Sequence, residues 1–207
     1  MPISPCGLLE SCDLNLAEQR SWRDTPARTC PGVYLVALTD DPNDGSIVLP
    51  EAPVDLNALD LWIDECPEMK LNRERPLVGS LSRYLSSYWL PGETVLYVGM
   101  ATSLQDRIGK FFSHRLGRSS PHRGGHWLKA LSNLSELSIF TAMCESVDDA
   151  GKYESRLIEE FISQIPEVIR NNQPNPQLPL PYANLEWRTG GRKLRKQKSL
   201  TKQAIGS

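Results

Sequence analysis

The 207-residue chain has no apolar run that approaches the roughly 18 residues of a membrane-spanning helix. Its first residues lack a basic start followed by an apolar stretch, so we expect neither a secretory signal nor a membrane partner. The five cysteines are scattered and form no CxxC pair, which argues against a disulfide scaffold and a zinc or redox motif. Unpaired thiols of this kind favour a reducing, cytoplasmic location.

Acids and bases are unevenly distributed, although the net charge is only -2. Residues 39–93 carry eleven acids and four bases. Between Gly99 and Ser135 the only acid is Asp106, against six bases and all three histidines. From Trp187 to the end there are seven bases and no acid. A polyanion would favour this second half, because each neutralised phosphate releases counterions. A solvated charge run is the alternative interpretation of the last segment.

Hydrophobic periodicity predicts an α+β protein. Strands are expected over 33–38, 93–99 and 137–143. Helices are expected over 14–22, 55–64, 77–89, 106–113, 126–131 and 150–164. This order of elements fits a small α+β layer better than a doubly wound sheet.

One carboxylate occupies an apolar helix face. At helical spacing Leu157, Ile158 and Phe161 share one face of the 150–164 helix, and Glu154 lies near the centre of that face. An acid in such a place must be paired, metal-bound or protonated, because burying it alone is unfavourable. The alternative is a simple role at the helix start, where the dipole favours acids. Glu159 points away from the stripe and offers a natural control.

Four segments resemble the GIY-YIG nuclease superfamily in their order and local spacing. Gly32-Val33-Tyr34 begins the first expected strand, and Tyr97-Val98-Gly99 ends the second. Arg107 follows in the next helix, and Glu154 lies in the last one. The two tyrosine motifs are much farther apart than is usual in that family. Phe111 stands where the family commonly has histidine or tyrosine, and no asparagine role is assigned to Asn171 or Asn172.

The resemblance implies a domain over 31–181 built on a small three-stranded, mostly antiparallel sheet flanked by helices. Residues 40–92 would be a long insertion between the first two strands, 1–30 a leader and 182–207 a basic C-terminal tail. Long insertions add little closure entropy, so we expect 33–38 still to pair antiparallel with 95–98.

The function implied by the resemblance is that of a DNA endonuclease that needs Mg²⁺ or Mn²⁺ and no small-molecule cofactor. Glu154 would hold the metal, and Arg107 would clamp the phosphate bidentately. Tyr34 and Tyr97 would lie near the attacking water, one of them as its base or its positioner. A phenol with a pKa of about 10 is a poor base at neutral pH, so a neighbouring cation must assist it.

Nucleic-acid contacts are expected from the basic central segment and from the tail. The candidates are Gly99, Lys110, His114, Arg118, His122, Arg123, His126, Arg192, Lys193, Arg195 and Lys196. Such contacts would position DNA without reading its sequence. Two alternatives remain open at this point: a catalytically weak module that binds nucleic acid or docks a partner, and a small interaction domain with a coincidental match. The oligomeric state is also open.

Overall fold

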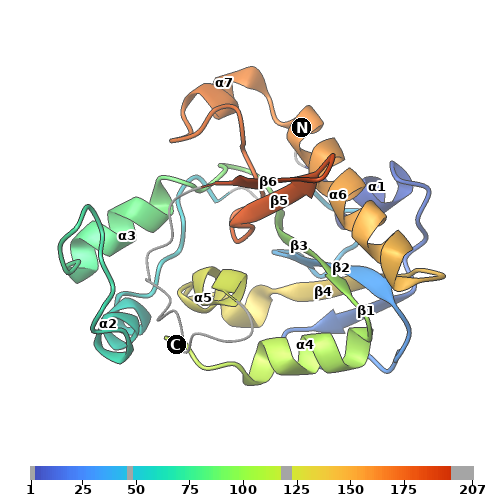
Figure 1. Cartoon of the computed structure of the whole chain (residues 1–207), viewed down its shortest axis with the longest axis horizontal. Coiled ribbons are helices and arrows are strands. Elements are labelled where there is room, and N and C mark those ends of the chain that lie inside the picture. The colour runs from blue at the N-terminus through green and yellow to red at the C-terminus, as the bar shows by residue number, and fades with distance from the viewer. Residues whose placement is uncertain (1–2, 46–48, 118–122, 197–207) are drawn as a thin grey trace.

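A four-stranded antiparallel sheet forms the centre of the protein (Figure 1). The structure is a computed structural model that describes residues 3–45, 49–117 and 123–196. The strands of the sheet are β1 (Glu18–Ser21), β2 (Gly32–Ala37), β3 (Val95–Ala101) and β4 (Ser138–Met143). Their order is β1-β4-β2-β3, which leaves β1 and β3 at the two edges.

Helices and one hairpin surround this sheet. The helices are α1 (Pro5–Glu10), α2 (Leu56–Glu65), α3 (Val78–Ser86), α4 (Leu104–Ser113), α5 (Arg123–Lys129), α6 (Val147–Gln164) and α7 (Glu167–Asn171), with a 3₁₀ turn at Leu134–Glu136. The hairpin consists of β5 (Glu186–Thr189) and β6 (Arg192–Arg195). Within the described ranges no helix is both long and apolar enough to cross a membrane.

Strand β2 is buried on both faces, which explains its unbroken apolar run. Tyr34 and Val36 point into one core, which helices α2 to α5 share. Val33 and Leu35 point into the second core, which is covered by α1 and α6. The sheet therefore separates two helical layers (Figure 1).

The predicted antiparallel pairing of the first two strands is confirmed. Tyr34 lies opposite Gly99, and Leu35 lies opposite Val98, although more than fifty residues intervene in the chain. The intervening segment carries α2 and α3, whose buried side chains join the same core as Tyr34. The insertion therefore contributes to the core rather than leaving it.

The sheet has four strands rather than the three expected, and the helix expected over 14–22 is wrong. Strand β1 occupies that position and pairs antiparallel with β4, with Gln19 opposite Phe140. Its side chains are mostly half-buried, as suits an edge strand. Pairing with β4 satisfies backbone groups that a short isolated helix could not, so tertiary context overrides local propensity. The segment 1–30 also supplies Leu8 and Leu9 to the second core.

The beginning of the expected basic tail is an ordered hairpin. Gly190 and Gly191 connect β5 to β6 with φ values of +53° and +72°. Two consecutive residues with positive φ form the turn that matches strand twist, and glycine adopts it without strain. Residues 197–207 of the expected tail lie outside the described residues.

Candidate active site

The four side chains predicted to act together come from four elements and meet at the β3 edge of the sheet. Tyr34 of β2 and Tyr97 of β3 have ring centroids 5.7 Å apart. Arg107 of α4 interacts electrostatically with both phenols and with the Glu154 carboxylate of α6. Residues up to 120 positions apart in the chain therefore form one cluster, as the resemblance predicted.

Glycine is required at two positions of this cluster by close contacts. A Cβ at Gly99 would lie 2.7 Å from Cε1 of Tyr97 and 2.8 Å from Cζ of Tyr34. A Cβ at Gly32 would lie 2.4 Å from the Ala142 carbonyl oxygen and 2.8 Å from Cδ1 of Leu104. Gly99 thus admits the two tyrosine rings, and Gly32 admits the first turn of α4.

Helix α4 fixes the direction of Arg107. Ser103 caps the helix by accepting a hydrogen bond from the Asp106 amide. Phe111, one turn beyond Arg107, is buried and places its ring 5.8 Å from Tyr97 and 6.4 Å from Tyr34. Phe111 therefore lies beside both tyrosines as an apolar wall and supplies no polar group there.

Glu154 reaches the site around the open edge of β3. Its Oε1 accepts a hydrogen bond of 3.1 Å from the Met100 amide, which points away from β2. Edge strands leave such groups unpaired, so the carboxylate occupies a position where a backbone donor is available. Glu154 is partly buried, whereas Glu159 is exposed on the opposite face of α6, as the periodicity predicted.

Burial dominates the protonation of these groups. It raises the pKa of Tyr34, and the Arg107 guanidinium opposes this rise. The pKa of Tyr97 is raised further by burial, by Tyr34 and by Glu154. Burial also raises the pKa of Glu154, while the Met100 amide, Arg107 and Arg188 hold it down. Both phenols therefore keep their protons at neutral pH in this state.

Two polar atoms at the centre of the cluster have unused hydrogen-bonding capacity. The Tyr34 hydroxyl and the Arg107 Nε are buried and make no hydrogen bond of normal geometry within the part of the chain described. Both side chains nevertheless interact with each other and with Tyr97, so they form one polar group inside the aromatic core. The Glu154 carboxylate interacts electrostatically with the same guanidinium.

Sequence reasoning missed Asn184, which holds the β3 edge. Its Nδ2 donates to the Val98 carbonyl and its Oδ1 accepts from the Val98 amide, both at 2.8 Å. The side chain thus imitates a neighbouring strand beside Tyr97. Asn184 is buried in an apolar stretch, and that unusual setting was the available signal. Asn171 and Asn172 instead lie at the end of α7.

Hairpin β5–β6 adds charge near the carboxylate. Arg188 lowers and Glu186 raises the pKa of Glu154 through electrostatic interaction. Trp187 places the hairpin by donating from Nε1 to the Ser155 carbonyl at 3.1 Å. The site therefore includes part of the segment expected to be a tail.

The predicted nucleic-acid contacts separate into exposed and buried groups. Gly99 lies against the tyrosines, whereas Lys110, Arg192, Lys193 and Arg195 are exposed. Lys193 forms an ion pair of 2.6 Å with Glu186. Arg118 and His122 lie outside the described residues, as does the side chain of Arg123.

Three of the predicted phosphate contacts are buried, so the structure does not present them to DNA. His114 and His126 face each other with Nε2 atoms 2.7 Å apart and stacked rings. The Trp62 ring makes an edge contact with His126, and Lys129 donates to the His114 carbonyl. Lys196 is only 3% exposed and donates to backbone carbonyls. In each case aromatic or backbone partners replace solvent.

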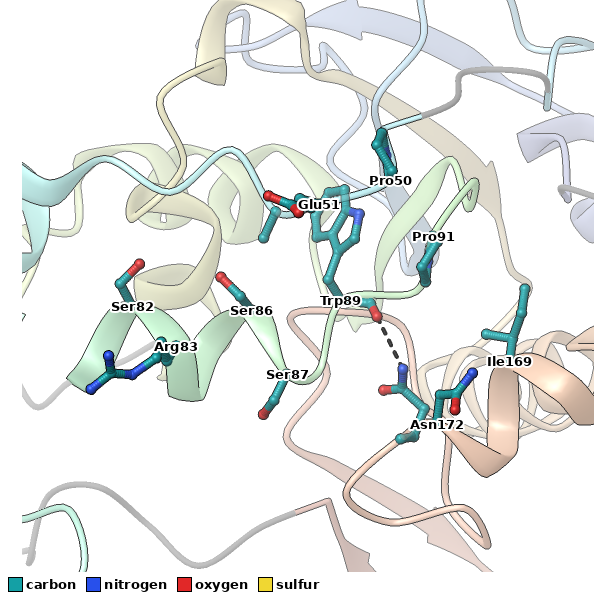
Figure 2. A pocket seen from close by; sticks show the side chains of 12 residues that line it. Pro50, Glu51, Ser82, Arg83, Ser86, Ser87, Trp89, Pro91, Ile169 and Asn172 are labelled. Atoms are coloured by element: carbon teal, nitrogen blue, oxygen red, sulfur yellow. Dashed lines mark hydrogen bonds between the residues drawn. The ribbon is translucent and has the colours of Figure 1, made fainter. Parts of the chain in front are cut away.

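A pocket of about 560 Å³ lies elsewhere, between α3 and the end of α7 (Figure 2). Trp89 and Arg83 line it, and the dashed line marks the bond from Gln173 Nε2 to the Trp89 carbonyl. None of the four clustered side chains lines this pocket.

Glu154 is the carboxylate of the cluster that could take part in binding a divalent cation. Among the described residues no group of three or more His, Cys, Asp or Glu side chains could hold a metal. Glu154 has one carboxylate oxygen on the Met100 amide, and no hydrogen bond engages the other within the described ranges. Mg²⁺ commonly uses one or two carboxylates and keeps its remaining waters, so a single ligand suits it.

Comparison with known proteins identifies no relative. No family model matches the chain, and neither a curated protein nor a solved structure matches it.

Proposed function

We propose that this protein is a divalent-metal-dependent endonuclease that hydrolyses phosphodiester bonds in DNA, of the kind represented by GIY-YIG nucleases. The observation that carries the proposal is the meeting of Tyr34, Tyr97, Arg107 and Glu154 at one sheet edge. These side chains supply a cation, a carboxylate and two hydroxyl groups, as phosphate chemistry requires.

Each residue has a role that its surroundings support. Glu154 would hold Mg²⁺ or Mn²⁺, which supplies charge neutralisation at the phosphate and at the leaving oxygen. Arg107 would bind the scissile phosphate, because its side chain is partly exposed and its guanidinium always carries charge. Because their pKa values are raised, Tyr34 and Tyr97 are suited to hold a water or a phosphate oxygen by donating hydrogen bonds.

Exposed cations would position the DNA backbone. Lys110 follows Arg107 on α4, and Arg192 and Arg195 lie on β6 of the hairpin near Glu154. Such contacts act on phosphates and add affinity that falls as salt rises. They provide no means of choosing one base sequence over another.

A second candidate function is that of a module that binds nucleic acid or a partner and cuts poorly. Two observations favour it. Tyr34 has no exposed surface, and Phe111 places an apolar ring where a polar side chain is common in the resembling family. In that case the partly exposed Arg107 would bind a phosphate, and no tyrosine would activate water.

Incubation of the pure protein with supercoiled plasmid tests the proposal directly. We expect nicking or linearisation with Mg²⁺ or Mn²⁺ and none with a chelator. Arg107→Ala should abolish cleavage, whereas Arg83→Ala, which changes an exposed arginine on α3, should not. DNA binding by the wild-type protein without cleavage under any divalent metal would favour the second candidate. A protein that neither cleaves nor binds DNA would overturn the nuclease proposal and would leave, of the second candidate, only a module that binds another partner.

A further inference from the structure

Lys196, directly after β6, has a buried amino group with an unusual set of partners. Its Nζ donates to the carbonyl oxygens of Leu180, Pro181 and Tyr182 at 3.2, 3.2 and 3.1 Å. Three acceptors converge on one nitrogen, and only a protonated amine has three N–H groups to offer them. The carbonyl set is therefore complementary to a primary ammonium ion.

Aromatic rings complete the surroundings of this amine. Nζ lies 5.3 Å from the Tyr88 ring centroid, 5.5 Å from that of Trp127 and 6.0 Å from that of Tyr182. Ring faces attract cations, and more strongly when water is excluded. Burial lowers the pKa of Lys196 to about 7, and the ionisable groups that face it are the two phenols. The rings and carbonyls oppose that effect by favouring the charged form.

The amine lies where it can fasten the hairpin. The Lys196 amide donates to the Leu185 carbonyl at 2.9 Å, so both ends of the hairpin meet at this residue. On its other side the hairpin contacts α6 through Trp187, which bonds to Ser155, the neighbour of Glu154. An anchor at Lys196 therefore holds β5 beside the carboxylate of the candidate active site.

We propose that the three carbonyls and three rings around Lys196 form a binding site for a primary ammonium ion, whose resident ligand is Lys196 itself, and that its occupancy latches hairpin β5–β6 against α6. The proposal does not depend on nuclease activity. Because Lys196 is tethered beside the site, its effective concentration is high and dissolved amines should not displace it. An alcohol of the same shape should bind worse, since it has one donor and no charge.

Chemical replacement of the side chain tests this site. Lys196→Ala removes the atoms from Cγ to Nζ, and n-propylammonium has the same atoms in the same order. Amide hydrogen exchange of 186–195 in the full-length protein reports whether the hairpin is docked. We expect exchange to accelerate at least about tenfold in Lys196→Ala, since losing even one charge-assisted hydrogen bond changes an equilibrium by about that factor. Adding n-propylammonium chloride should restore slow exchange.

Matched variants and probes separate a specific site from general loosening. Arg192→Ala, on the exposed part of β6, should exchange like the wild-type protein with or without the amine. In Lys196→Met the amides of 186–195 should exchange fast. They should not respond to the amine, because the methionine side chain fills the space that n-propylammonium would occupy. Unchanged exchange in Lys196→Ala would overturn the latch. Failure of n-propylammonium to restore protection, or equal restoration by n-propanol, would overturn the ammonium site.

Discussion

Replacing Glu154 by glutamine removes one negative charge and preserves the side-chain shape. The new amide oxygen can still accept the Met100 hydrogen bond that Oε1 accepts now. The charge beside Arg107 and Arg188 is lost. Because burial raises the pKa of Glu154 above its unfolded value, the ionised form opposes folding, and this contribution grows as pH rises through the shifted pKa. At neutral pH the variant should therefore unfold at the same or a higher denaturant concentration than the wild-type protein.

The same substitution should slow cleavage, although it does not lower stability. A metal at a phosphoryl centre contributes several kcal/mol of charge stabilisation, and each 1.36 kcal/mol corresponds to tenfold in rate. Loss of about 4 kcal/mol would slow Mg²⁺-dependent plasmid nicking by about three orders of magnitude. DNA affinity in a chelator should be equal or higher, because a negative charge near the phosphates is gone. The control is Glu159→Gln, which neutralises an exposed acid on the opposite face of α6.

The unfolding and the nicking measurements are both needed to assign the role of Glu154. Full nicking activity in Glu154→Gln would refute the metal role, whatever the stability of the variant. If Glu159→Gln lost activity and Glu154→Gln kept it, the assignment of faces on α6 would be wrong. Loss of cleavage together with a lower unfolding midpoint would show a structural role and contradict the linkage argument.

Three further outcomes follow from burial and close contacts. Gly99→Ala places a methyl group 2.7 to 2.9 Å from tyrosine ring atoms, and urea unfolding should show a loss of about 1–3 kcal/mol; an unchanged midpoint would contradict the contact. Asn184→Ala leaves the buried Val98 amide and carbonyl unpaired and should lower the free energy of unfolding by about 3 kcal/mol, against less than about 0.5 kcal/mol for exposed Asn172→Ala. Burial raises the pKa of Glu93 from 4.5 to about 7, so the folded state holds the proton more tightly. Relative to Glu93→Gln, wild-type stability should then fall by about 3 kcal/mol as pH rises from about 4.5 to about 7, and parallel pH profiles would disprove it.

The local hydrophobic pattern was sufficient to predict most strands and helices. The apolar β-prone runs over 33–38, 93–99 and 137–143 predicted strands, and the structure has β2, β3 and β4 there. Period-3.6 spacing placed Glu154 on the inner face of α6 and Glu159 on the outer one. These features depend on residues within one or two turns of each other, so a single sequence contains the necessary information.

The resemblance to the GIY-YIG superfamily also predicted that Tyr34, Tyr97, Arg107 and Glu154 lie together, which no local rule predicts. Their chemical role stays a prediction, because convergence shows what a site could hold and not what it does. What the sequence could not show is that Phe111 lies against both tyrosine rings, since that contact depends on how α4 crosses the sheet.

Tertiary structure alone decided where the polar partners lie. Strand β1 forms because β4 offers unpaired backbone groups, and Asn184 is buried because β3 is an edge strand. The basic residue Lys196 reads as part of a solvated run, yet its amine is enclosed by carbonyls and rings from distant segments. The sequence around a charged residue does not show how much of its side chain will be buried on folding. Long-range contacts set the extent of this burial. Burial in turn determines whether the charged group is available to bind DNA or stabilises the fold.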